Sequence, residues 1–432
     1  MEKLPNEIIY IIIDYCCFLT KIRFSCINKY FNDCIKINDL MNIPKCFLNK
    51  LNNKILQHPK YKNLKKLRIL GNIDQKGIEK LDLTELNVKN KGNITNVSFM
   101  KNLKRLNASH ECGIDQKCIE GLNLTELNAR YNKKIYNVSF MKNLKILYAS
   151  ASDECSIDQN GIQGLDLIEL YADDNEKITN VSYMKNLKRL DASGCSCKID
   201  QQGIQYLDLV ELDAYDNEKI TNVSYMKNLK CLNAGGYCGI DQNGIKDLDL
   251  IKLDANYNPK IINISYMKNL KYLCANGKCG IDQKGIQGLD LIQLDVSYNR
   301  KITNVSYMKN LKILDAGGKC GIDQKGIRGL DLTVLNVANN PKITNVTHMK
   351  NLKCLDASND HSGIDQDGIQ GLDLIKLNVD YNTKITNVSF MKNLKFLYAS
   401  GDCGIGQKGI QGLDLIKLDA ENNKKITSIN RI

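Results

Sequence analysis

The sequence predicts an α/β solenoid, in which short parallel strands stack side by side and the chain returns through turns of helix. Length is the first reason, because 432 residues exceed the size at which one globular core usually keeps growing. An internal period of 41 to 43 residues is the second reason, since such spacings are typical of repeat proteins. The string Met-Lys-Asn-Leu-Lys marks this period and begins at Met100, Met141, Met184, Met226, Met267, Met308, Met349 and Met391.

The apolar residues inside each period are the third reason, because the same skeleton occurs twice per period. In residues 165–206 it consists of Leu167, Leu170, Ala172 and Asn175, followed by Leu187, Leu190, Ala192 and Cys195. This Leu-x-x-Leu-x-Leu-x-x-Asn pattern resembles the leucine-rich-repeat family. The resemblance covers residues 64–432 and about 18 short repeats. It implies a parallel β-sheet on a concave face and 3₁₀ or short helical turns on the convex face.

The alternation within one half-repeat predicts a short strand. Leu170 and Ala172 are separated by one residue, so both point into the core while Glu169 and Tyr171 face solvent. Asn175 follows where the chain turns. We expect its side-chain amide to bond backbone groups that the turn leaves unpaired.

The return path also has a regular apolar spacing. Ile178, Val181 and Met184 recur at every third residue, which predicts a turn of 3₁₀ helix packed inward. In the second half-repeat, Ile204 and Leu207 predict a short helical turn. No half-repeat can bury its own apolar face, so neighbouring repeats must stabilise one another.

Cysteines recur in the second half-repeat. The predicted column consists of Cys112, Cys155, Cys195, Cys238, Cys279, Cys320 and Cys403. Because two kinds of half-repeat alternate, neighbours in the column lie two strands, or about 9 to 10 Å, apart. A disulfide needs Cα atoms within about 7 Å. We therefore expect reduced structural thiols, as in a cytoplasmic or nuclear protein that is not secreted.

Composition argues against several functional classes. The net charge of +12 is spread along the chain rather than gathered in one segment, which disfavours a nucleic-acid partner. No apolar run approaches the roughly 18 residues that span a bilayer, and Glu7 and Asp14 bracket the run 8–13, unlike a secretory signal. The four histidines have no nucleophile or ligand at a regular spacing. We therefore expect no catalytic residue, metal or cofactor.

Residues 1–40 lie outside the repeats and resemble an F-box. The matching features are Leu4-Pro5, Glu7-Ile8, the apolar stretch through Tyr15, Leu19 and Ile22, and the segment 25–31. Proline suits a first helical turn, and the segment is predicted to be a small all-α unit of three helices. Residues 41–63, with Pro44 opening an apolar-periodic stretch, are predicted to form a helical joint or N-terminal cap leading into the solenoid at 64–432.

The F-box resemblance implies binding to a Skp-family adaptor and, through it, to a cullin-based ubiquitin ligase. The adaptor contacts that it implies are Leu4, Pro5, Ile8, Ile12 and Leu19. The helix carrying the run 8–13 would be apolar nearly all round, so one face can pack within the segment while another meets a partner. Alternatively, these helices serve only as a cap for the solenoid.

The outward side of the strands is the predicted substrate surface. In the N-terminal repeats its residues alternate between Glu and Arg, whereas aromatic and aliphatic residues enter towards the C-terminus. The residues expected to bind a substrate are Asp213, Asp254, Tyr257, Tyr272, Asp295, Tyr298, Ile313, Asp315, Val334, Tyr381 and Phe396. Exposed aromatics beside acidic groups are typical of protein-binding hot spots. Alternatively, Asp and Asn cap turns and Tyr covers strand edges.

The sequence thus indicates a protein-interaction adaptor and not an enzyme, with the repeats holding an unknown target protein. One alternative is a repeat scaffold that has no link to a ubiquitin ligase. Another is a nucleic-acid-binding scaffold that uses the lysines of Met-Lys-Asn-Leu-Lys as a basic stripe. That stripe has no interleaved aromatic residues, which favours a solvated face.

Overall fold

Leucine at the centre of each three-residue strand determines the sheet. In the computed structural model, which describes residues 37–150 and 156–427, the register places these leucines beside one another: Leu86 aligns with Leu106 and Leu253 with Leu273. All four are buried. Their neighbours on either side point outward because side chains alternate along a strand.

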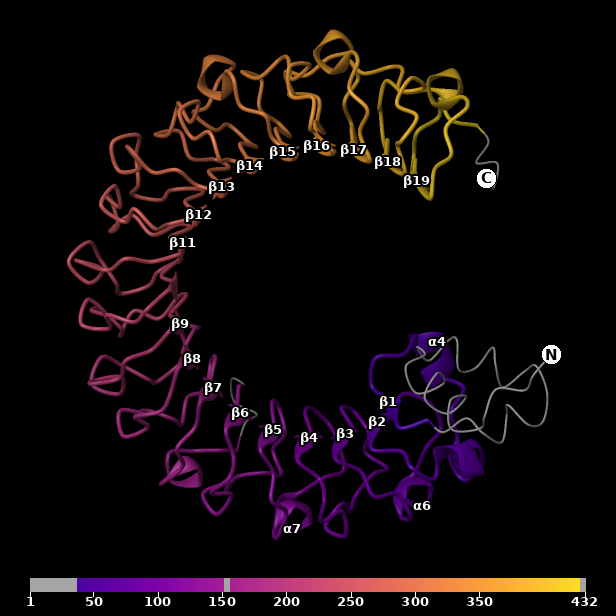
Figure 1. Cartoon of the computed structure of the whole chain (residues 1–432), viewed down its shortest axis with the longest axis vertical. Helices are drawn as coiled ribbons and strands as arrows, with labels where there is room; N and C mark the ends of the chain where they lie inside the picture. The colour runs from indigo at the N-terminus through magenta and orange to yellow at the C-terminus, as the bar shows by residue number, and fades with distance from the viewer. Residues whose placement is uncertain (1–36, 151–155, 428–432) are drawn as a thin grey trace, which may run out of the picture. The chain divides into compact units, whose positions relative to one another are not determined.

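Two compact units divide the chain, Met1–Leu207 and Asp208–Ile432, hereafter unit 1 and unit 2. Within each unit the parallel strands lie side by side in chain order (Figure 1). The strands of unit 1 are β1 (Asp39–Leu40), β2 (Lys66–Arg68), β3 (Glu85–Asn87), β4 (Arg105–Asn107), β5 (Glu126–Asn128), β6 (Ile146–Tyr148), β7 (Glu169–Tyr171) and β8 (Arg189–Asp191). Its helices are α4 (Lys45–Leu48), α5 (Asn53–Leu56), η1 (Pro59–Tyr61), α6 (Gln75–Ile78), α7 (Gln116–Ile119) and η2 (Asn160–Ile162).

Unit 2 repeats the same plan. Its strands are β9 (Glu211–Asp213), β10 (Cys231–Asn233), β11 (Lys252–Asp254), β12 (Tyr272–Cys274), β13 (Gln293–Asp295), β14 (Ile313–Asp315), β15 (Val334–Asn336), β16 (Cys354–Asp356), β17 (Lys376–Asn378), β18 (Phe396–Tyr398) and β19 (Lys417–Asp419). Its helices are η3 (Lys325–Ile327), η4 (Asp367–Ile369) and η5 (Gln407–Ile410). The predicted solenoid of short parallel strands is therefore confirmed within each unit over the described residues, with little helix.

A buried asparagine stabilises the turn after the strand. Asn258 is fully buried, and its Nδ2 donates to the carbonyls of Ala234 at 2.7 Å and Ile240 at 3.0 Å. Its Oδ1 accepts the N–H of Lys260 at 2.9 Å. Comparable bonds from Nδ2 to two carbonyls are made by Asn132, Asn175, Asn299, Asn340, Asn382 and Asn423. The predicted role of this asparagine is confirmed.

The return path differs from the prediction in one half-repeat. Val181 and Met184 are fully buried, and the N–H of Met184 donates to the Val181 carbonyl at 2.9 Å. These residues nevertheless form isolated turns and no 3₁₀ helix. Asn180 gives the reason, because its Oδ1 accepts both the N–H and the hydroxyl of Ser182 and so competes with continued helical bonding.

Short helices occur in several of the other half-repeats, but not at Ile204 and Leu207, where the sequence predicts one and residues 201–206 form turns. These short helices are α6, α7 and η2 to η5, each three or four residues long. Asp74 caps α6 by accepting the N–H of Gly77, and Asp115 caps α7 in the same way. In these two repeats the aspartate of the recurring Ile-Asp-Gln string is thus an N-cap residue.

The N-terminal segment is described only from residue 37 onward. The predicted adaptor contacts Leu4, Pro5, Ile8, Ile12 and Leu19 lie outside the described residues. At its described end, the segment is strand and not helix, because Leu40 is fully buried beside Leu67 when β1 pairs with β2. After it, α4, α5 and η1 place short helical turns within residues 41–63.

The cysteine column contains Cys197 in place of Cys195. Cys197 is fully buried two residues before Ile199, as Cys238 is before Ile240, whereas Cys195 is exposed. The prediction was wrong at this position because the loop after the strand varies in length, so only counting back from the isoleucine gives the equivalent residue. None of the described cysteines forms a disulfide, and burial raises the pKa of Cys238 to about 11.

Candidate functional site

The strand face is the side of each sheet that points away from the buried leucines. It has two columns, formed by the first and the third residue of each strand, hereafter column 1 and column 2. A further position, three residues after each strand of unit 2 ends, has a positive φ, for example 56° at Asp216 and 57° at Tyr257. We call it the post-strand position.

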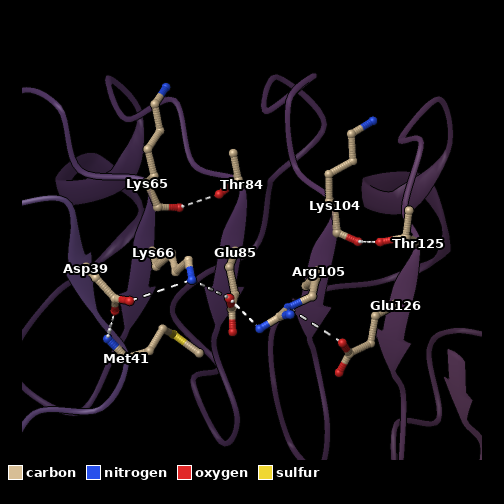
Figure 2. Close-up of polar contacts among 10 residues, drawn as sticks. All are labelled: Asp39, Met41, Lys65, Lys66, Thr84, Glu85, Lys104, Arg105, Thr125 and Glu126. Carbon is tan, nitrogen blue, oxygen red and sulfur yellow. Dashed lines mark hydrogen bonds and ion pairs between the residues drawn. The ribbon is translucent and has the colours of Figure 1, made fainter.

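In unit 1, column 1 is a ladder of ion pairs (Figure 2). The Nζ of Lys66 lies 3.7 Å from Asp39 and 3.9 Å from Glu85. The guanidinium of Arg105 lies 2.8 Å from Glu85 and 3.6 Å from Glu126. Burial raises the pKa of Glu126, and Arg105 opposes that shift. The charges on these strands are therefore satisfied within the chain.

Column 2 of unit 1 contains two tyrosines that the sequence prediction missed. The rings of Tyr148 and Tyr171 stack with centroids 4.3 Å apart and an interplanar angle of 5°. The hydroxyl of Tyr171 donates to Glu169 at 2.8 Å, and Arg189 lies 3.3 Å from the same carboxylate. Two adjacent departures from Asp and Asn in this column were the available signal. The polar groups of this cluster therefore also bond to one another within the chain.

Column 2 of unit 2 has aspartates whose partners are neutral. Asp254 accepts the N–H of Asn256 at 3.0 Å. Asp295 accepts the side-chain amide of Asn276 at 3.0 Å, and Asp315 accepts a backbone N–H and a side-chain amide. In the described parts of the chain none of these three carboxylates forms an ion pair. No cationic group of the described residues lies within ion-pair distance of these three carboxylates.

The aspartate pKa values reflect this arrangement. Burial is the main cause that raises the pKa of Asp254, and the charges of Asp213 and Asp295 raise it further. Burial likewise raises the pKa of Asp315, with Asp295 and Asp356 adding to the shift. Neighbouring carboxylates along the column thus repel one another, which favours a cation over an anion as a ligand.

Tyrosines occupy the post-strand position after several strands of unit 2. Tyr257 and Tyr298 have φ values of 57° and 59° and are 54% and 58% exposed. Each ring lies over a glycine, since a Cβ built on Gly277 or Gly318 would lie 2.4 or 2.6 Å from it. Tyr381 has the same arrangement, with 55% exposure. One face of each ring is held by the chain while the rest meets solvent.

Column 1 of unit 2 carries the remaining predicted residues. Tyr272 is 40% exposed, and Ile313, Val334 and Phe396 are half-buried on the strand face. β11 to β14 bring together Asp254, Tyr272, Asp295, Ile313 and Asp315 with the adjoining Tyr257 and Tyr298. Asp213, Val334, Tyr381 and Phe396 belong to other strands or the loop after them. The structure positions these residues, and their role in binding stays a prediction.

Another tyrosine that the sequence prediction missed is Tyr398 in β18. The Nζ of Lys417 lies 4.6 Å from its ring centroid and that of Lys376 lies 5.4 Å away. Tyr398 also lines a shallow hollow with Val334 and Cys354. At this end of unit 2 the chain itself supplies the cations that the tyrosine binds.

Among residues 37–150 and 156–427, no three His, Cys, Asp or Glu side chains are grouped so as to hold a metal ion. No helix of that described part has the length and apolar character needed to cross a membrane.

Several solved structures are similar to this chain, although no protein-family model and no curated protein matches it. The TLR13–ssRNA13 complex is 18% identical with a TM-score of 0.49, over 90% of this chain and 63% of TLR13. The Rad7–Elc1 complex of yeast is 16% identical with a TM-score of 0.40, over 76% of this chain and 89% of that one. The functional domain of InlJ from Listeria monocytogenes is 20% identical with a TM-score of 0.33, over 79% and 64%. The chain thus spans less than two thirds of the TLR13 and InlJ chains, and these scores carry no inference about function.

Proposed function

We propose that the chain is a non-catalytic protein-interaction adaptor whose strand face in unit 2 holds a target protein. One observation carries the proposal: β11 to β14 place exposed tyrosines and the half-buried Ile313 beside carboxylates that lack an ion-pair partner in the described structure. Aromatic anchors with adjacent polar groups are typical of binding hot spots. The strand face of unit 1, whose charges are paired within the chain, lacks this combination.

The finer proposal is that the adaptor serves a ubiquitin ligase. It is supported by the F-box resemblance of residues 1–40, through which a Skp-family adaptor and a cullin would be recruited in the cytoplasm or nucleus. The competing proposal is a protein-binding scaffold without a ligase link. The exposed residues of unit 2 favour a protein partner under either proposal.

Capture with a purified Skp-family adaptor tests the ligase link. Wild-type chain should retain the adaptor, and the double variant Ile8→Asp, Ile12→Asp should lose it, because charged groups would replace the apolar contacts. If both proteins retain the adaptor equally, or if the wild type does not retain it, the ligase link fails and the protein-binding scaffold without a ligase is favoured.

Capture of target proteins tests the strand face separately. The double variant Tyr272→Ala, Ile313→Ala should lose proteins that the wild type retains. The control is Ile146→Ala, which removes a half-buried column 1 side chain in unit 1. If the unit 2 variant keeps every protein that the wild type captures, the strand face of unit 2 is not the binding surface.

A further inference from the structure

Cationic groups of the chain lie against the strand face in unit 1 and at β18. In unit 1, Arg105 and Lys66 pair with the acidic residues of column 1. At β18, Lys376 and Lys417 lie over the ring of Tyr398. At both of these places the chain supplies its own cations to the strand face.

At β11 to β14 such cations are missing among the described residues. No ammonium or guanidinium group there lies over the rings of Tyr257 or Tyr298. Lys252 lies on the same strand as Asp254, two residues away, but makes no ion pair with it. Asp295 has only neutral partners. A binding partner that is complementary in charge would therefore be positively charged.

We propose that β11 to β14 bind an extended cationic polypeptide, with basic side chains three residues apart placed against Asp254–Tyr257 and against Asp295–Tyr298. This inference rests on the proposed function and names the class of partner. The guanidinium of arginine suits both members of each pair, since it bonds carboxylates and stacks on aromatic rings.

The spacing of the two pairs sets the register. Asp254 lies in β11 and Asp295 in β13, and β12 separates them, so the pairs are about 9.5 Å apart. A polyproline II chain has three residues per turn and rises about 3.1 Å per residue, so three residues span about 9.3 Å and return the side chain to the same face. A polypeptide in this extended conformation, lying across the strands, therefore presents every third side chain to successive pairs.

The backbone fixes the orientation of Tyr257 and Tyr298 before any ligand binds. A positive φ is uncommon for a bulky residue, and the same position holds Asp216, Asn339 and Asn422 after other strands. Gly277 and Gly318 let each ring lie flat against the backbone, because any side chain there would collide with it. The ring face that remains is exposed in a fixed orientation, which reduces the entropy lost on binding.

The test uses purified full-length chain and fluorescence anisotropy of labelled peptides. The probe is a twelve-residue Gly-Ser peptide with arginine at every third position, and its matched controls carry citrulline at those positions or the same arginines in one block. We expect the spaced arginine peptide to bind and both controls to bind at least about threefold more weakly.

Three substitutions locate the site. Tyr298→Asn should weaken binding about threefold and Asp295→Asn about threefold to fivefold. Tyr381→Asn is the matched control, because Tyr381 has the same φ and exposure but follows β17, where column 2 holds Asn378. It should leave the affinity unchanged. Circular dichroism melts of all three should agree within a few degrees, since asparagine already occurs at equivalent places.

Several outcomes would overturn the inference. They are equal binding of the citrulline peptide, equal binding of the blocked arginine peptide, or wild-type affinity in both Tyr298→Asn and Asp295→Asn. If no peptide binds while Tyr272→Ala, Ile313→Ala still loses its captured protein, the cationic partner is wrong and the proposed function stands. If that double variant keeps its protein, the proposed function fails instead.

Discussion

The strand faces of the two units are built on one scaffold but differ in how their charges are satisfied. In unit 1, Glu85 lies 2.8 Å from Arg105 on the neighbouring strand. In unit 2, Asp254 and Asp315 have raised pKa values and only neutral partners. Both units have the column of buried leucines, and both have buried asparagines after alternate strands, such as Asn132 and Asn258. The residues that build the repeat thus differ from those in which the two strand faces differ, so each set can be changed separately.

The largest effect should come from the scaffold that the units share. Asn258→Ala removes the partner of two carbonyls and one N–H, all at a buried site. Each unsatisfied buried group costs about 1–3 kcal/mol, so we expect a loss of about 3–5 kcal/mol in the free energy of unfolding. Chemical denaturation followed by circular dichroism measures it. The same loss is expected for Asn132→Ala in unit 1.

Asn243→Ala provides the control for that loss. Asn243 is exposed in the same repeat, so its truncation should change the free energy of unfolding by no more than about 0.5 kcal/mol. If Asn258→Ala were as mild as this control, the buried asparagine would not be what stabilises the turn.

An intermediate effect is expected from the glycine beneath a tyrosine of unit 2. Gly318→Ala combines a positive φ of 65° with a Cβ only 2.6 Å from the ring of Tyr298. The φ alone costs about 1–2 kcal/mol, and displacing the ring should add about 1 kcal/mol. Gly371→Ala isolates the first part, because its φ is 73° and no heavy atom lies within 4 Å of the added carbon. Equal losses of stability in the two variants would show that the ring is not held by the glycine.

A smaller effect should follow from opening the ion-pair ladder of unit 1. Arg105→Gln leaves Glu85 and Glu126 without their guanidinium. Since the Arg105 side chain is 50% exposed, the loss should be only about 0.5–1 kcal/mol and should shrink as salt is added. Denaturation at low and high ionic strength measures it. A loss that does not depend on salt would mean that Arg105 acts through packing and not through charge.

The sequence predicts the buried positions of the repeat better than it predicts the contacts on its surface. The inward positions follow from alternation along a strand, so Leu170, Ala172 and the buried Asn175 were predictable. Which outward charges pair depends on the register between strands, which no single repeat encodes. The flat packing of Tyr298 over Gly318 depends on backbone dihedrals at both residues. Its sequence signal was only a tyrosine where other repeats have asparagine or aspartate.

The smallest effect tests the uncompensated charge of unit 2 directly. Because the pKa of Asp254 is raised on folding, its contribution to stability is present below the unfolded value near 3.8 and is lost as pH rises through the folded pKa. Asp254→Asn keeps an oxygen for the N–H of Asn256 and removes the charge. We expect the variant to match or exceed the wild type by up to about 0.5 kcal/mol at pH 7, with the advantage vanishing near pH 4.

Asp331→Asn should show the opposite pH dependence, and it is the control for that result. Asn351 donates to the Asp331 carboxylate at 2.5 Å, and this bond lowers the pKa of Asp331. Its stabilising contribution is therefore present above the unfolded value and is lost as pH falls, so the variant should be weaker at pH 7 and approach the wild type in acid. Parallel pH profiles for the two variants would contradict the difference between paired and unpaired carboxylates. Opposite profiles would mean that Asp254 is retained at no gain in stability, which leaves recognition as the reason for its charge.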